Sequence, residues 1–145
     1  MTKLQIEYND LADPFLFKCK KYFNFLIEEY NFKIIDEIIK TGGLTLIYRN
    51  DLLVITINYE YLTETIGIDI IKVPINEVFK KPLKEDVLFL LHYLKYVKPD
   101  FTTVSPNPLM NLADALKFYG QNILKGEFWI SSSEIFELHQ QKSKQ

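Results

Sequence analysis

The chain has 145 residues, of which 48% are hydrophobic and 25% are charged, and its formal net charge is −2. This size and composition are typical of one globular domain, 1–145, and argue against intrinsic disorder. Since no apolar run approaches the roughly 18 residues of a membrane span and Cys19 is the only cysteine, we expect a cytoplasmic protein with no membrane association, no disulfide, no metal site and no cofactor.

The first predicted element is a helix over 13–30. Asp13 suits the N-cap and Pro14 suits the first helical turn. Because Cys19 lies in the apolar stripe of this helix, we expect its thiol to be buried and unreactive. The stripe repeats every three or four positions and consists of Leu16, Cys19, Phe23, Leu26, Ile27 and Tyr30.

Four strands are predicted next. Gly42 and Gly43 should supply the positive φ of the first turn, and Asn50-Asp51 should form the second. Connections this short predict an antiparallel meander. The four strands cover 32–40, 44–49, 52–61 and 66–73, which are rich in β-branched residues.

The third strand shows which side chains share a face. Alternate residues of a strand point to opposite faces of the sheet. The opposite face then changes from apolar Val54 near the turn in the 50s to Glu60 at the other end. The set predicted to face the core is Leu53, Ile55, Ile57 and Tyr59.

Three helices are predicted after the strands. The stretch 87–97 is apolar nearly all round, with His92 and Lys95 as its polar members. Asn107-Pro108 indicates the start of a helix over 109–125, with Gly126 as its left-handed C-terminal residue.

Ser131 and Glu134 form a capping box, which indicates a last helix to about His139, with 139–145 as a frayed tail. The predicted fold class is therefore α+β: an N-terminal helix, a four-stranded antiparallel meander and three C-terminal helices.

Charge is uneven along the chain. Residues 28–77 contain four basic and nine acidic residues, a net charge of −5. Such a segment repels nucleic acid and favours a basic partner, mainly through electrostatic steering. We therefore expect a protein partner and no binding of nucleic acid.

The sequence offers few groups for catalysis. His92 and His139 lack the short spacing of a helical metal pair, and no glycine-rich phosphate-binding motif occurs. The serines 131–133 have no nearby histidine or lysine in a nucleophile-activating pattern, so helix capping explains them better than nucleophilic chemistry. Asp69 is a candidate for an acid pair or cation site if the strand register places it beside Glu60 or Thr56. We expect that the chain is not an enzyme.

Three stretches carry a resemblance to a known group: "FNFLIEEYNFKI", "IYRNDLLVITINYEY" and "LADALKFYGQNILKGEFW". The chain resembles small uncharacterised bacterial proteins, which in turn resemble the immunity proteins of polymorphic and contact-dependent toxin systems. The resemblance implies a protein that binds a cognate toxin without performing chemistry, often through an acidic surface.

The predicted function is a non-catalytic protein-binding domain, an immunity or antitoxin-type inhibitor that binds a basic toxin through an acidic sheet face. One alternative is a small-ligand-binding protein or enzyme with a pocket between the sheet and helix 87–97, containing His92 and Tyr93. Another alternative is a homodimer. It would form through the apolar face of helix 87–97 or through the sheet face opposite the core, which is partly apolar. The residues predicted to contact a partner are Arg49, Asn58, Glu60, Tyr61, Glu64 and Asp69.

Overall fold

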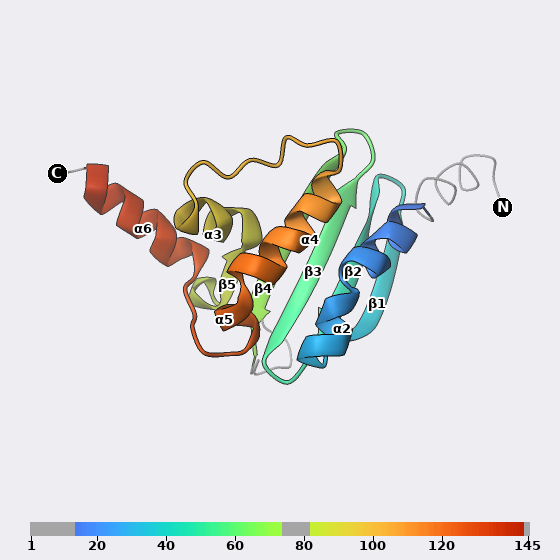
Figure 1. The fold of residues 1–145 in the computed structure, drawn as a ribbon, viewed down its shortest axis with the longest axis horizontal. Coiled ribbons are helices and arrows are strands. Elements are labelled where there is room, and N and C mark those ends of the chain that lie inside the picture. The colour runs from blue at the N-terminus through green and yellow to red at the C-terminus, as the bar shows by residue number, and fades with distance from the viewer. Residues whose placement is uncertain (1–13, 74–81, 144–145) are drawn as a thin grey trace.

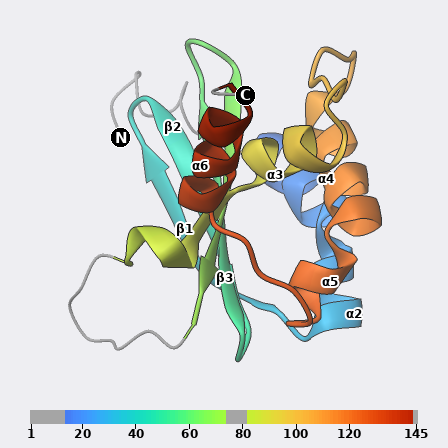
Figure 2. The ribbon, with the colours of Figure 1, turned by 90° about the vertical axis from the view of Figure 1, so that its left-hand side faces the viewer.

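The computed structural model describes residues 14–73 and 82–143, so the predicted N-cap Asp13 lies outside the described residues. The fold is α+β, with an antiparallel sheet that carries α-helices on one of its faces (Figure 1). Figure 2 shows α2, α4 and α5 together on that side of the sheet. We call this the inner face and the opposite one the outer face.

The predicted helix 13–30 is two helices. Residues 14–22 are helical, a turn follows at Phe23, and α2 covers Asn24–Tyr30. Cys19 is completely buried, as expected, and burial raises the pKa of its thiol to about 12. The turn shifts the helical phase, so that Phe25 is buried whereas Ile27, predicted for the stripe, is 39% exposed.

Five strands form the sheet, in the order β1-β2-β3-β4-β5, and every neighbouring pair is antiparallel. The meander of four strands is confirmed, and the fifth strand corrects the prediction. A short apolar run does not distinguish a strand from a helix, and residues 87–89 pair with β4 before α3 begins. The strands are β1 (Lys33–Lys40), β2 (Gly43–Arg49), β3 (Leu53–Glu60), β4 (Thr65–Lys72) and β5 (Val87–Phe89).

The core lies between the inner face and the helices. Leu53, Ile55 and Ile57 of β3 are buried there, as the alternation predicts. Tyr59 is only partly buried and stacks on Phe15, with their ring centroids 4.2 Å apart. The face assignment from the sequence is therefore confirmed for β3.

Strand β1 is an edge strand with a bulge. Its pairing with β2 shifts by one residue between Ile34 and Asp36. Beyond the bulge, Glu37 lies opposite buried Leu46 and forms an ion pair with Lys20 of helix 14–22. A charged side chain of this edge strand therefore points toward the helices.

The turn between β1 and β2 corrects one prediction. Neither Gly42 nor Gly43 has positive φ; among the described residues, this conformation occurs at Asn31, Glu64 and Gly126. Gly43 is required for another reason, because a Cβ there would overlap the backbone carbonyl oxygen of Tyr59. Gly126 has φ +77°, as predicted.

The helices in the second half of the chain are more numerous than predicted. The described residues there form a 3-10 helix η2 (Lys84–Asp86) before β5 and four α-helices after it, two of which replace the predicted helix 109–125, which is interrupted at Gly120. The capping box is confirmed: the Ser131 hydroxyl accepts the Glu134 N–H at 3.1 Å, and the Glu134 carboxylate accepts the Ser131 N–H at 3.4 Å. The last helix continues well past His139. The α-helices are α3 (Leu90–Val97), α4 (Pro108–Tyr119), α5 (Gln121–Leu124) and α6 (Ser132–Ser143).

Candidate functional site

The candidate site lies on the outer face of the sheet, opposite α2, α4 and α5 (Figure 2). In Figure 1, α2 and α4 lie in front of the sheet, and α6 extends outward beyond β5. Residues directly opposite one another on paired strands share a face, so the register defines the members of the outer face. On β1 to β4 they include Lys33, Asp36, Ile38, Lys40, Thr45, Ile47, Arg49, Val54, Thr56, Asn58, Glu60, Thr65, Asp69 and Ile71, all half-buried or exposed.

Two cross-strand pairs organise the centre of this face. The Thr45 hydroxyl donates a hydrogen bond to Oδ1 of Asn58, with an oxygen–oxygen distance of 2.6 Å. Thr56 lies directly opposite Asp69 and hydrogen-bonds its carboxylate. The register therefore pairs Asp69 with Thr56, and it places Glu60 opposite Thr65, several residues away.

Charge is segregated across the outer face. The cations Lys33, Lys40 and Arg49 lie on β1 and β2, together with the carboxylate of Asp36. We define the acidic patch as three carboxylates: Glu60 at the end of β3, Glu64 in the turn between β3 and β4, and Asp69 on β4. Lys72 of β4 lies opposite buried Leu53 and over the Trp129 ring, so among the described residues of β3 and β4 no cation faces outward.

The structure separates the residues predicted to contact a partner. Asn58, Glu60 and Asp69 share the outer face, and Glu64 lies in the exposed turn with φ +52°. Arg49 lies at the opposite end of the face, opposite Lys33. Tyr61 is partly buried against the core, with its ring centroid 5.7 Å from that of Tyr59. The acidic patch therefore contains three of the six predicted residues.

Asp69 is a half-buried carboxyl at the centre of the outer face. Partial burial raises its pKa above the usual value, and this effect exceeds the opposing influences of the Thr56 hydrogen bond and of nearby His92. The charged form is therefore held at some cost in the folded protein.

Asp69→Asn should raise the melting temperature at pH 7 by about 1–2 °C, because it removes a partly desolvated charge while an amide oxygen can still accept from Thr56. A raised carboxyl pKa means that the unfolded chain loses this proton first as the pH rises. The destabilisation by the charged Asp69 is therefore absent below the pKa that this carboxyl has in the unfolded chain. It reaches its full size above the higher pKa that the carboxyl has in the folded protein. Melting curves at pH 3 and pH 7 would test this, and an equal difference at both pH values would contradict it.

The two residues of the predicted alternative pocket have different neighbours. Tyr93 is buried, and its hydroxyl donates to the Tyr119 carbonyl oxygen at 3.4 Å. His92 is exposed, and its Nδ1 lies 3.1 Å from Oγ of Ser132. The two side chains therefore do not converge.

The contact with His92 gives Ser132 a histidine neighbour that the sequence pattern around the serines 131–133 did not indicate. The Ser132 oxygen also accepts the backbone N–H of Phe89 at 2.7 Å, which leaves its own hydrogen free to be donated to His92. Ser132 thus joins β5, α3 and α6. The sequence could not reveal this contact, because it joins residues 40 positions apart.

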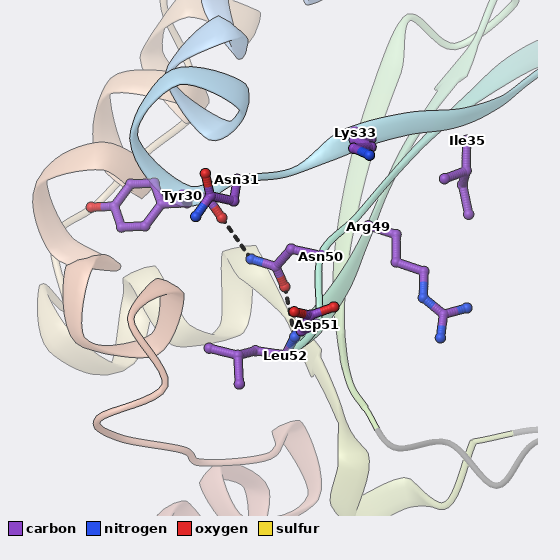
Figure 3. A pocket seen from close by; sticks show the side chains of 8 residues that line it. All are labelled: Tyr30, Asn31, Lys33, Ile35, Arg49, Asn50, Asp51 and Leu52. Carbon is purple, nitrogen blue, oxygen red and sulfur yellow. Dashed lines mark hydrogen bonds between the residues drawn. The ribbon is translucent and has the colours of Figure 1, made fainter.

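A hollow of about 640 Å³ lies at the end of the sheet where α2 leads into β1 and β2 turns into β3 (Figure 3). The "YRND" turn is part of its wall, and Asn50 fixes the shape of that wall. The Asn50 amide donates to the Tyr30 carbonyl at 2.8 Å, and its Oδ1 accepts the N–H groups of Leu52 and Leu53, each at 2.8 Å. The lining residues are Tyr30, Asn31, Lys33, Ile35, Arg49, Asn50, Asp51 and Leu52.

Two further properties concern the described residues alone. Within 14–73 and 82–143, no three side chains of the metal-binding types come together as a ligand set. No helix in these ranges has both the length and the apolar character needed to cross a membrane.

Comparisons with protein-family models, with curated proteins and with solved structures found no match to this chain.

Proposed function

We propose that this chain is a non-catalytic protein-binding domain, an inhibitor of the immunity type, that binds a basic toxin through the acidic patch of its outer face. The observation that carries the proposal is the segregation of charge: Glu60 and Asp69 lie on the β3–β4 half of the face, Glu64 lies in the turn that joins these two strands, and the outward cations Lys33, Lys40 and Arg49 lie on β1 and β2. A basic surface that approaches the β3–β4 half therefore meets these carboxylates and no outward lysine or arginine of β3 or β4.

The composition of this half also suits a protein interface. Val54 and Ile71 are half-buried neighbours on β3 and β4 and provide apolar area. Protein interfaces combine an apolar centre with a polar rim. Charges at the rim mainly increase the rate of association and determine which partner binds. The resemblance to immunity proteins supports the same proposal, since that class acts by binding.

The test is capture of the partner by charge variants of the tagged protein. From a lysate of the native host, the wild-type chain should retain one stoichiometric basic protein, and E60K/E64K should weaken binding by about 100-fold, as expected for reversal of two rim charges. The matched control is E28K/E137K, which changes the net charge equally at exposed positions on α2 and α6. Co-expression with the wild-type chain should relieve the toxicity of the captured protein.

The outcomes separate the alternatives. Retention of the same partner by E60K/E64K, or loss of the partner with E28K/E137K, would contradict binding through the acidic patch. If light scattering gives twice the monomer mass for the wild type and the monomer mass for Val54→Lys, the homodimer would be favoured instead.

An enzyme is the second candidate, and the observation that favours it is the 3.1 Å contact between Ser132 and His92. Seryl nucleophiles are activated by such a base. The Ser132 oxygen, however, already accepts the Phe89 N–H, which ties it to the end of β5. We therefore expect a fluorophosphonate probe to leave Ser132 unlabelled, as measured by intact-mass spectrometry beside a known serine hydrolase.

Ser132→Ala should instead lower the free energy of unfolding by about 1–2 kcal/mol, because Phe89 and His92 both lose a hydrogen-bond partner. Labelling of Ser132 that disappears in His92→Ala would favour the enzyme and contradict the non-catalytic proposal.

A further inference from the structure

Two cations from neighbouring strands lie at the same end of the outer face. Lys33 and Arg49 lie directly opposite each other on β1 and β2, and both line the hollow shown in Figure 3. Arg49 is the only arginine of the chain. The ion pairs among the described residues join Lys20 to Glu37 and Lys117 to Glu29, so neither Lys33 nor Arg49 takes part in one.

Like charges directly opposite each other on a sheet are destabilising. The fold therefore holds these two cations together at a cost, and burial or salt bridging within the described residues does not account for the arrangement. Asp51 also lines the hollow, but the Arg49 side chain extends away from Asn50 and Asp51 (Figure 3). The guanidinium is thus directed to the side of the hollow on which Ile35 lies.

The frame of the hollow is rigid. Asn50 joins the end of α2 to the turn between β2 and β3 through three side-chain hydrogen bonds, each 2.8 Å long. Asn31 holds the chain in the left-handed conformation, with φ +61°, at the step from α2 to β1. A ligand would therefore meet Lys33 and Arg49 at the ends of strands whose positions are already fixed.

The chemistry of the lining selects the ligand. A guanidinium offers a planar fork of N–H donors and an ammonium offers a compact positive charge, and together they suit the oxygens of a dianionic phosphate. Ile35 and Leu52 are 54% and 45% exposed and offer apolar surface to an organic group. A volume of about 640 Å³ lies within the range of sites for small molecules, roughly 300–1,000 Å³.

We propose that the hollow between Lys33 and Arg49 binds a small phosphate monoester, with the phosphate between the two cations and the organic group against Ile35 and Leu52. This site is separate from the acidic patch, and it goes beyond the proposed function.

The test uses the full chain and phenyl phosphate as the probe. At constant ionic strength, 10 mM phenyl phosphate should raise the melting temperature of the wild-type protein by about 3 °C, since a ligand that binds the folded state stabilises it. Inorganic phosphate should give a smaller rise, because it lacks the apolar group. R49Q and K33Q should abolish the rise, and R49K should weaken binding about tenfold because the fork is lost.

The matched control is K40Q, which removes a cation from the same strand and face as Lys33 but outside the hollow. Its response to phenyl phosphate should equal that of the wild type. Without the probe, R49Q and K33Q should melt at or slightly above the wild-type temperature, because they relieve the repulsion between the two cations. A structural role for Arg49 would instead lower this temperature.

Three results would overturn the proposal: no rise in the wild type, a rise that persists in R49Q, or an equal rise with benzoate, which would show a site for carboxylates in general. Loss of the phosphate response with retention of the protein partner would show that the two sites are independent.

Discussion

Replacing Asn50 with alanine is expected to lower the free energy of unfolding by about 2–4 kcal/mol, because the side chain makes three hydrogen bonds to backbone groups of α2 and of the turn between β2 and β3. The Tyr30 carbonyl and the Leu52 and Leu53 N–H groups would each lose their Asn50 partner. Denaturation in urea, followed by circular dichroism, would measure the change.

Asn50→Asp provides the matched control. Its carboxylate can still accept from Leu52 and Leu53, but it cannot donate to Tyr30, so we expect a loss about half as large as that of Asn50→Ala. Equal losses for the two variants would show that the tie to α2 carries the whole effect. If Asn50→Ala lowers the free energy of unfolding by less than about 1 kcal/mol, the hydrogen bonds of Asn50 do not stabilise this turn as we expect.

Gly43→Ala is expected to lower the free energy of unfolding by about 2–3 kcal/mol, because its Cβ would overlap the Tyr59 carbonyl oxygen and force the two strands apart. This clash involves backbone, so no change of rotamer can relieve it. The position where β2 pairs with the end of β3 would be the first to open. Urea denaturation measures the loss, and amide hydrogen exchange of β2 and β3 would locate it.

Gly42→Ala is the natural comparison, since no atom outside the adjoining residues lies within 4 Å of a Cβ placed there and φ at Gly42 is not positive. An alanine at such a position restricts the unfolded chain and is expected to stabilise the protein by about 0.4–1 kcal/mol. The two neighbouring glycines should therefore respond in opposite directions. Equal destabilisation by both substitutions would indicate a requirement of the turn itself instead of a steric contact at Gly43.

Local patterns in the sequence predicted much of the fold. The alternation in β3 assigned its buried side chains, the capping box at Ser131 located the start of α6, and Gly126 adopts the predicted left-handed conformation. Each of these signals depends on residues within a few positions of one another. Strand β5 was missed because its three residues merge with the apolar sequence of α3.

The candidate sites depend on register and tertiary packing, which the sequence did not reveal. An unbroken register from Lys40 and Gly43 would place Lys33 opposite Asn50, and the bulge at Ile35 moves it opposite Arg49. The pairing of the two cations is therefore a product of one extra residue. The position of Ser132 beside His92 likewise follows from the packing of α6 on β5 and α3.

The bulged strand β1 also affects whether molecules of this protein pair with one another at the edges of their sheets. An exposed edge strand can add a strand of another molecule, and proteins prevent this with lysines, bulges and charged side chains that point inward. Strand β1 has Lys33 and Lys40 at its ends, the bulge at Ile35, and Glu37 turned toward Lys20. Removing Ile35 would straighten the edge while leaving Lys33 opposite Arg49. We therefore expect edge-to-edge aggregation to increase in this variant, although the two cations remain paired.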